Sequence, residues 1–429
     1  GRFPIGVGTV PALPLVQRHL GPFTPADSLR YLAERRHIAR ADLRRAITDK
    51  ADGEPVVLAR LADLVQQRPD ITPAEVLGYR ADLTALVLRV LRPMTDPGLR
   101  WLLRYGVVPR ELSLDFVRVV LEPLLRAAVS GGSDLDDPSE DMLPGDRAEP
   151  LFPTGADLDV EASWAELKRF AGTTSWVVPV PGELDALRFT GGVAEPMRRL
   201  IRHHGVHDRL HAAAVEFFET KAEADPERWD RWTREAVYHR FRLLGPTAAD
   251  YWREALDRVE LGEADRRAAL AQEVLGPDYV DADGEPRRWD DDTPVVGRDS
   301  VVEARYELAA ALTQMARLGG VTAADQLWSR AEENYTAVVR EQRRRGVDVV
   351  PDWRLAYVRA ALALKCGDPT TAKDELERAL PRARDTKDEV RLRILLGDVL
   401  LLLGDRQAPD EYRRAAEAAV RVGARRWEP

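Results

Sequence analysis

Residues 301–429 contain two copies of one spaced pattern of small and large residues, and this pattern constrains the fold more than any other feature. In the first copy the successive offsets are 7, 5, 4 and 3, over Ala360, Gly367, Ala372, Leu376 and Ala379. The second copy, one residue shorter in its second interval, consists of Gly397, Gly404, Ala408, Tyr412 and Ala415. Small residues at this spacing let two helices approach closely while a bulky residue packs behind them. The two copies therefore predict two stacked helix pairs.

The pattern resembles the tetratricopeptide repeat. Gly367 and Gly404 are 37 residues apart, close to that repeat's length of about 34 residues. The segments Val302–Leu318 and Ala323–Arg340 fit a third, more divergent pair. Stacked helix pairs offer a concave surface made of neighbouring helix faces, so we expect an α-solenoid over residues 301–429 that binds a protein or peptide. Candidate partner contacts on this solenoid are Tyr357, Lys373, Arg391 and Arg413.

The composition is typical of a soluble globular protein, with 45% hydrophobic and 31% charged residues. A chain of 429 residues can form two to four domains with cores of their own. No apolar run approaches the roughly 20 residues that span a bilayer, and no signal-peptide pattern begins the sequence. The single cysteine, Cys366, excludes an intramolecular disulfide and a multi-cysteine zinc site. We therefore expect a cytoplasmic protein without membrane contact.

The net charge of −9 resides in one stretch of the chain. Residues 131–162 contain ten acids and a single arginine, and we expect an acidic, disordered or loosely held insertion there. The rest of the sequence is nearly neutral and shows no electrostatic footprint for nucleic acid. Residues 1–23, rich in proline and glycine, predict an extended N-terminal segment, and residues 278–300 predict an acidic linker.

Residues 24–80 predict a small helical domain. Thr24 and Thr72 each stand before a proline and three residues before an acid, which is the signature of a helix N-terminus. Residues 81–192 predict a winged helix, because three helical stretches are followed by a β-hairpin signal centred on Pro181-Gly182-Glu183.

Residues 193–277 carry only helical signals and predict a helical linker domain before the repeats. The expected fold class is therefore mainly α: a helical domain plus a winged helix with one β-hairpin, followed by an α-solenoid of tetratricopeptide-like helix pairs.

The junction Asp52-Gly53-Glu54-Pro55 separates two helical runs of the first domain. Gly53 suits the left-handed end of one helix, and Pro55 suits the first turn of the next, where its missing N–H costs nothing. Ordinary helix punctuation is one interpretation of this junction. The junction comes first, the predicted winged helix follows, and the runs Arg209–Phe218 and Glu235–His239 come last. This order resembles the STAND class of bacterial signal-transduction NTPases (NB-ARC/NACHT-like), in the part C-terminal to the P-loop domain.

The resemblance implies that Gly53 and Pro55 lie on the adenine side of a nucleotide site. ATP or ADP would bind only together with a P-loop NTPase domain, which we expect upstream or in another chain. Many STAND proteins sense the nucleotide phosphate with a His-Asp pair in the winged helix. The nearest match, His207-Asp208, lacks the expected hydrophobic context and receives no such role.

No catalytic or metal site is predicted within the sequence. The phosphate-binding pattern G-x-x-x-x-G-K-[ST] does not occur, and Asp290-Asp291-Asp292 does not follow an apolar strand. His203, His207 and His211 share a spacing of four, but Gly205 interrupts them, so packing histidines are the favoured interpretation. The run from Asp281 to Glu285 resembles only part of a calcium loop.

Three functions remain open. The first is the regulatory, partner-sensing portion of a STAND-type NTPase switch. The second is a winged-helix transcription regulator, whose candidate recognition helix Leu114–Arg126 balances Arg118 and Arg126 against Asp115 and Glu122, so that nucleic-acid binding is not favoured. The third is a tetratricopeptide adaptor that does not switch.

Overall fold

The computed structural model describes residues 23–68, 70–78, 96–131, 159–183, 185–202, 206–289, 291–318 and 321–423. The chain divides into two compact units, one from residues 1–107, 111–114 and 136–204, the other from residues 108–110, 115–135 and 205–429. Most of the predicted N-terminal segment 1–23, the first winged-helix stretch from residue 81 and most of the acidic insertion 131–162 lie outside the described residues.

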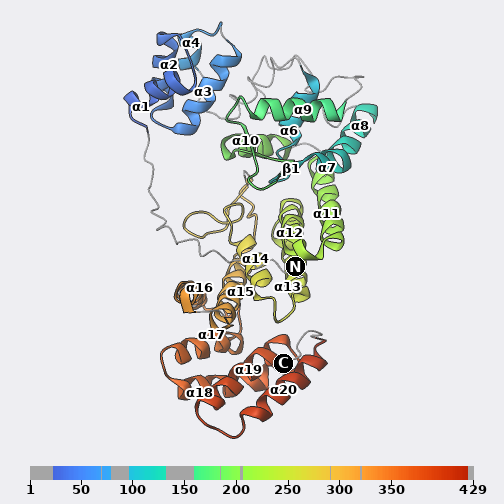
Figure 1. Cartoon of the computed structure of the whole chain (residues 1–429), viewed down its shortest axis with the longest axis vertical. Helices are drawn as coiled ribbons and strands as arrows, with labels where there is room; N and C mark the ends of the chain where they lie inside the picture. Colours follow the sequence, from blue (N-terminus) through green and yellow to red (C-terminus); the bar gives the residue numbers. More distant parts are fainter. Residues whose placement is uncertain are drawn as a thin grey trace, which may run out of the picture. The chain divides into compact units, whose positions relative to one another are not determined.

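The fold class is confirmed: the described residues are mainly helical, with one small sheet (Figure 1). None of their helices combines the length and the apolar content that crossing a membrane would require.

The first unit begins with short helices whose ends follow the sequence signals. These elements are α1 (Pro25–Arg30), the π-helical turn η1 (Tyr31–Arg35), α2 (Ala41–Ala51), α3 (Pro55–Gln67) and α4 (Pro73–Gly78). The Thr24 hydroxyl accepts from the Asp27 amide at 3.2 Å. Thr72 and Glu75 cap α4 reciprocally, with Thr72 N donating to Glu75 Oε2 at 2.8 Å and Glu75 N donating to Thr72 Oγ1 at 3.3 Å. Both predicted helix starts are therefore confirmed.

A small sheet and three helices complete the first unit. They are α6 (Pro97–Tyr105), β1 (Leu112–Ser113), α9 (Val160–Ala171), β2 (Val177–Pro179), β3 (Ala186–Phe189) and α10 (Gly191–Arg202). The strand order is β1-β3-β2, all antiparallel, with Leu187 opposite both Leu112 and Pro179. The predicted hairpin is present, and Gly182 turns it at φ +82°. Strand β1 has only two residues and was not predicted.

The candidate recognition helix Leu114–Arg126 needs a correction. It is divided into α7 (Leu114–Phe116), the π-helical segment η2 (Val117–Leu121) and α8 (Glu122–Gly131). From Asp115 onward it belongs to the second unit, where the Phe116 ring packs edge-on against Phe217 with centroids 5.3 Å apart. Helix α9, not this segment, immediately precedes the hairpin in the described part of the chain. The apolar face of residues 114–126 is therefore core for the helices that follow.

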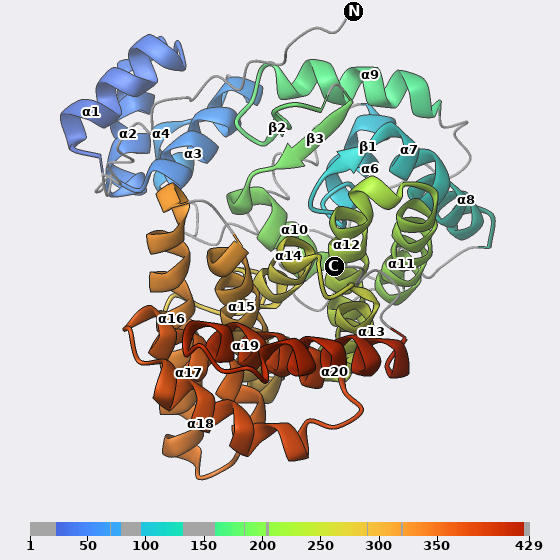
Figure 2. The same ribbon diagram turned by 60° about the horizontal axis from the view of Figure 1, so that its bottom comes forward.

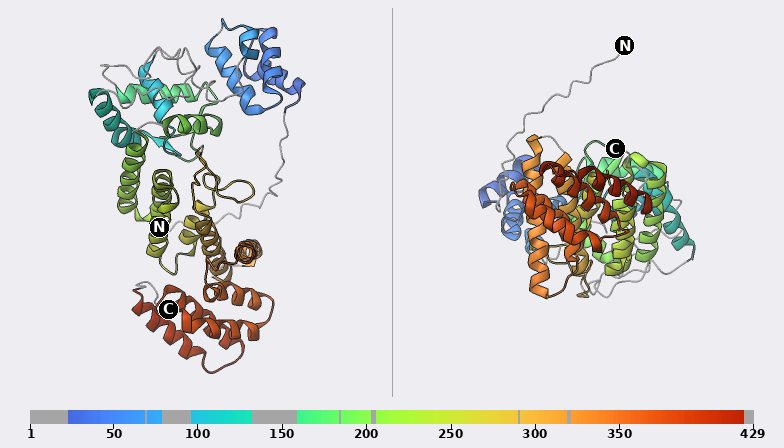
Figure 3. Two further views of the ribbon diagram at one scale, coloured as in Figure 1. Left: turned by 180° about the vertical axis from the view of Figure 1, so that it is seen from behind. Right: turned by 90° about the horizontal axis from the view of Figure 1, so that it is seen from below.

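The second unit continues with a succession of helices, seen from behind in Figure 3. The first are α11 (Val206–Ala224), η3 (Pro226–Arg228), α12 (Trp229–Leu244), η4 (Gly245–Ala248), α13 (Ala249–Arg258) and α14 (Ala264–Val274). Residues 278–300 are not the linker that we predicted. Tyr279, Val295 and Val296 are buried in one cluster with α12 and α13, and the segment closes on itself through the bridges Val280–Pro286 and Arg288–Pro294.

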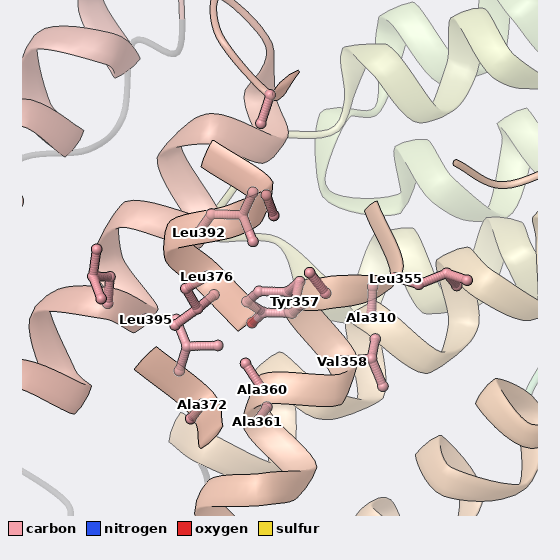
Figure 4. Packing of buried hydrophobic residues seen from close by; sticks show 14 of the residues in the cluster. Ala310, Leu355, Tyr357, Val358, Ala360, Ala361, Ala372, Leu376, Leu392 and Leu395 are labelled. Atoms are coloured by element: carbon pink, nitrogen blue, oxygen red, sulfur yellow. The ribbon is translucent and has the colours of Figure 1, made fainter. Parts of the chain in front are cut away.

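Three helix pairs form the end of the second unit, side by side in Figure 2. They are α15 (Arg298–Leu318) with α16 (Val321–Arg345), α17 (Asp352–Lys365) with α18 (Pro369–Ala379) and η5 (Leu380–Arg382), and α19 (Lys387–Leu402) with α20 (Ala408–Arg421). Figure 4 shows their shared core, in which Ala360, Ala372 and Leu376 meet Leu395. The two predicted pairs and the divergent third are confirmed.

The small residues of the repeated pattern serve two different purposes. Gly367 and Gly404 have φ values of +80° and +69° and end α17 and α19, with open space where a Cβ would stand. Gly397 lies inside α19, and a Cβ there would be 2.6 Å from the ring of Tyr412. Close helix approach therefore depends on Gly397, whereas the other two glycines serve the turns.

We predict that Gly397→Ala destabilises the last helix pair by about 1–3 kcal/mol, the usual cost of overpacking, because the added methyl overlaps Tyr412. The free energy of unfolding in urea measures this effect. Gly262→Ala is the matched control, since nothing lies within 4 Å of its Cβ position. Equal stability of the two variants would contradict the close approach.

Candidate functional site

The Gly53–Pro55 junction has the local geometry that the sequence predicts. Helix α2 ends at Ala51, and Asp52 and Gly53 both adopt positive φ, at 44° and 77°. The Glu54 amide donates back to the Ala51 carbonyl at 2.8 Å, and Pro55 is the first residue of α3. Glu54 and Pro55 are exposed. The role of Gly53 and Pro55 beside a nucleotide stays a prediction.

A buried charge cluster lies on α3, about two turns beyond Pro55. Asp63 is 1% exposed and pairs with Arg36, and Ser175 Oγ donates to its Oδ2 at 2.9 Å. Arg60 Nη1 is 3.7 Å from the same carboxylate, while its Nη2 donates to Thr190 Oγ1 at 2.5 Å. The cluster thereby ties α3 to both ends of the β2–β3 hairpin segment.

Arg60 is held in an environment that is poor for a cation. It is 2% exposed and lies over the Trp176 ring, 5.3 Å from its centroid. Burial, aided by repulsion from Arg36, lowers the pKa of its guanidinium to about 10. One carboxylate thus serves two arginines, and Asp63 is the residue on which the cluster depends. The sequence signal was an Arg-x-x-Asp interruption of an otherwise apolar helix, which we did not single out.

The four predicted partner contacts fall into two groups. Tyr357 and Arg391 are buried, at 4% and 7% exposure, so they belong to the interior of the repeats. Lys373 lies 3.5 Å from Asp405 and 3.8 Å from Glu377, and Arg413 lies 3.0 Å from Asp410 on the exposed side of α20. Whether a partner binds at these positions stays a prediction, and only Lys373 and Arg413 present their charges to solvent.

A ladder of ion pairs, buried at Arg267 and Glu307 and half-buried at Arg354 and Asp388, joins α14 to the first helices of the three pairs. Arg267 on α14 donates to Glu307 on α15 at 2.6 Å. Arg354 on α17 donates to the other oxygen of Glu307 at 2.7 Å and to Asp388 on α19 at 2.8 Å. Arg391 completes the ladder, with Nη1 donating to Asp388 at 3.2 Å. Arginine and carboxylate therefore alternate across four helices.

Glu307 is the central acid of this ladder. Burial acts to raise the pKa of its carboxyl, but Arg267 and Arg354 outweigh burial and lower that pKa to about 2. The Arg354 guanidinium also stacks over the Tyr306 ring, 4.7 Å from its centroid. A buried charge that loses its partner costs several kcal/mol. Movements that separate the four helices would break these pairs, so the pairs oppose such movements.

A second polar contact connects the same helices. Arg317 near the end of α15 pairs with Asp398 on α19, and its Nη1 donates to the Tyr357 hydroxyl at 3.3 Å. Tyr412 donates to the other oxygen of Asp398 at 2.6 Å. Tyr357 therefore links helices inside the unit, which explains why this predicted contact residue is buried.

The histidines of α11 lie in an aromatic core. His207 and His211 have ring centroids 4.4 Å apart, and His211 Nδ1 is 2.8 Å from Nδ1 of the buried His239 on α12. His203 lies outside the described residues. No group of three or more His, Cys, Asp or Glu side chains in the described ranges is arranged to hold a metal ion.

The run from Asp281 to Glu285, which resembles part of a calcium loop, forms a turn. The Asp281 carboxylate accepts hydrogen bonds from the amides of Asp283 and Glu285 and so closes it.

Among solved structures, this chain is similar to a crystal structure of a signal-transduction ATPase with numerous domains (STAND) that has a tetratricopeptide repeat sensor, from Pyrococcus horikoshii. The TM-score is 0.29 at 10% sequence identity, and the match covers 94% of this chain and 55% of that chain. The chain thus spans about half the length of that protein. No protein-family profile and no curated protein matches the sequence.

We predict that Asp63→Asn costs about 3–5 kcal/mol, as expected when one partner of a buried ion pair is removed, because Arg36 and Arg60 lose their shared carboxylate. Hydrogen exchange of the α3 amides reports the loss. Asp49→Asn on the exposed side of α2 is the control. Combining Asp63→Asn with Arg60→Met should recover part of the loss; strict additivity of the two changes would contradict direct coupling.

We predict an acid-dependent loss of stability that comes from Glu307. Its pKa in the folded protein lies below the ordinary value of 4.5, so its contribution is complete above about pH 4.5 and is lost as the pH falls toward 2. Urea unfolding at several pH values should show a shallower dependence over this window in Glu307→Gln than in wild type. Glu417→Gln, at an exposed position of α20, is the control and should keep the wild-type slope.

Proposed function

We propose that this chain is the regulatory, partner-sensing portion of a STAND-type NTPase switch. The helix pairs α15–α20 bind a protein or peptide. The first unit, with its helical domain and winged helix, passes the resulting state to a nucleotide-binding P-loop domain upstream or in another chain. ATP or ADP binds only with that domain, because the sequence contains no phosphate-binding loop.

The ion-pair ladder is the observation that carries the partner-sensing part. Directional contacts, centred on the buried Glu307, join α14, α15, α17 and α19 through Arg267, Glu307, Arg354 and Asp388. A surface whose helices are already fixed loses little conformational entropy when it binds a partner. A rigid row of helices thus supports recognition of an extended protein segment.

The α3 cluster supports the switching part. Pro55 starts α3 at an exposed position, and Arg60 and Asp63 on the same helix contact Thr190 and Ser175 around the hairpin. A domain that contacts the junction would therefore act on the helix that is tied to the winged helix. A partner shifts such a switch only by binding one arrangement more tightly than the other.

The test of this function begins with nucleotide turnover. Residues 1–429 alone should show no magnesium-dependent ATP hydrolysis, and tight, magnesium-dependent hydrolysis by these residues would contradict the proposal. The upstream coding sequence should contain a Walker A lysine within about 200 residues, on the scale of one domain.

The alternative, a transcription regulator, is tested by an electrophoretic mobility shift of DNA. A sequence-selective, salt-dependent shift that is lost in R118Q/R126Q would support it instead.

In the protein that includes the P-loop domain, Pro55→Ala should weaken ATP or ADP binding by several-fold, because the ring would no longer cover the base. Fluorescent-nucleotide titration measures the dissociation constant. Pro73→Ala is a matched control, since Pro73 is likewise the first residue of a helix, α4. Equal nucleotide affinities for the two variants would leave Gly53 and Pro55 as helix punctuation only.

A further inference from the structure

A groove of about 680 Å³ lies in the second unit, between the turn at residues 283–286 and the helices α15 and α16. Its volume falls within the range of about 300–1,000 Å³ that is typical of ligand sites. One wall comes from α16, the second helix of its pair, and none of the four predicted partner contacts lines the groove. The groove is therefore a separate candidate site on the repeats.

One face of α16 forms a long wall of this groove. The lining positions begin at Ser329 and recur at helical spacing through Glu332, Glu333, Thr336 and Arg340 to Glu341. At 1.5 Å per residue this wall is about 18 Å long. An extended peptide rises about 3.3 Å per residue, so about five residues would fit along it.

Two valines and one arginine of α15 also line the groove. Val301 and Val302 of α15 line it and are buried. Gly284 has φ +79°, and a Cβ there would be 2.6 Å from Arg305 Nη2. The glycine therefore lets the Arg305 guanidinium lie directly against the turn. In that position it can donate to carbonyl oxygens of a bound chain, whose backbone groups need partners.

The charges of the groove are unbalanced. Five carboxylates and three guanidiniums line it, which leaves an excess of two negative charges. Arg298 is already paired with Glu285 and, at 3.5 Å, with Glu341. Within the described part of the chain, Asp283, Glu332 and Glu333 make no side-chain ion pair. Arg305 and Arg340 likewise make no side-chain ion pair in these described ranges, so three unpaired acids face two unpaired guanidiniums. The neighbouring acids Glu332 and Glu333 on α16 thus favour a cationic occupant along that wall.

We propose that this groove binds an extended, lysine- or arginine-containing segment of a partner protein. The inference rests on the proposed function and names the partner chemistry that one site of the repeats recognises. The basic side chains pair with Glu332 and Glu333, the aliphatic parts lie on Val301 and Val302, and Arg305 donates to the peptide carbonyls. Backbone pairing fixes the extended shape, and the acids select the charge.

The test uses residues 1–429 and three fluorescein-labelled five-residue peptides that carry Lys, Gln or Asp at positions 2 and 4. Alternate positions of an extended chain face the same side. Fluorescence anisotropy should give the tightest binding for the Lys peptide, at least about fivefold tighter than for the Asp peptide, with the difference shrinking as salt is raised. E332Q/E333Q should abolish this preference.

The control variant is E254Q/E417Q, which removes two exposed helix glutamates outside the groove and should leave the preference unchanged. Preference for the Asp peptide, or equal binding by wild type and E332Q/E333Q, overturns the proposal. So does concentration-dependent self-association that E332Q/E333Q removes, because a second copy would then occupy the groove. None of these results bears on nucleotide turnover, so failure of this proposal can be distinguished from failure of the proposed function.

Discussion

The second unit depends on one set of interactions, the ion-pair ladder Arg267–Glu307–Arg354–Asp388, whose central acid Glu307 is buried. Apolar burial stabilises helix contacts but is not directional. Paired charges have strict geometry and a large cost when one partner is absent. The ladder therefore adds a directional constraint to the close packing of the small-residue core, and it spans α14, which precedes the repeats, as well as α15, α17 and α19.

The first unit uses the same physical device on a smaller scale. Asp63 is shared by Arg36 and Arg60, and with Arg60 it joins α3 to Ser175 and Thr190, which flank the β2–β3 hairpin. In each unit a buried acid, Asp63 or Glu307, is shared by two arginines, and apolar residues surround it. The specificity of the fold thus comes from few polar contacts within a permissive apolar packing.

Local features were predictable from the sequence. Helix starts at Pro55 and Pro73 follow from caps and prolines within a few residues, and the helix pairs follow from spacing within the repeat. Pairings between distant residues were not predictable. Glu307 meets Arg267 across 40 residues and Arg354 across 47, and no local pattern encodes such partners. Tyr357 and Arg391 were placed on the surface because helical spacing alone does not show which face a neighbouring helix covers.

Hydrogen exchange in Glu307→Gln, compared with wild type, tests most directly whether the ladder makes these helices one element. We predict a joint loss of amide protection in α14, α15, α17 and α19, with α11 unaffected, because removal of the central acid leaves both Arg267 and Arg354 without it. A loss of protection confined to α15 would contradict it, since the helices would then be held by their apolar contacts alone.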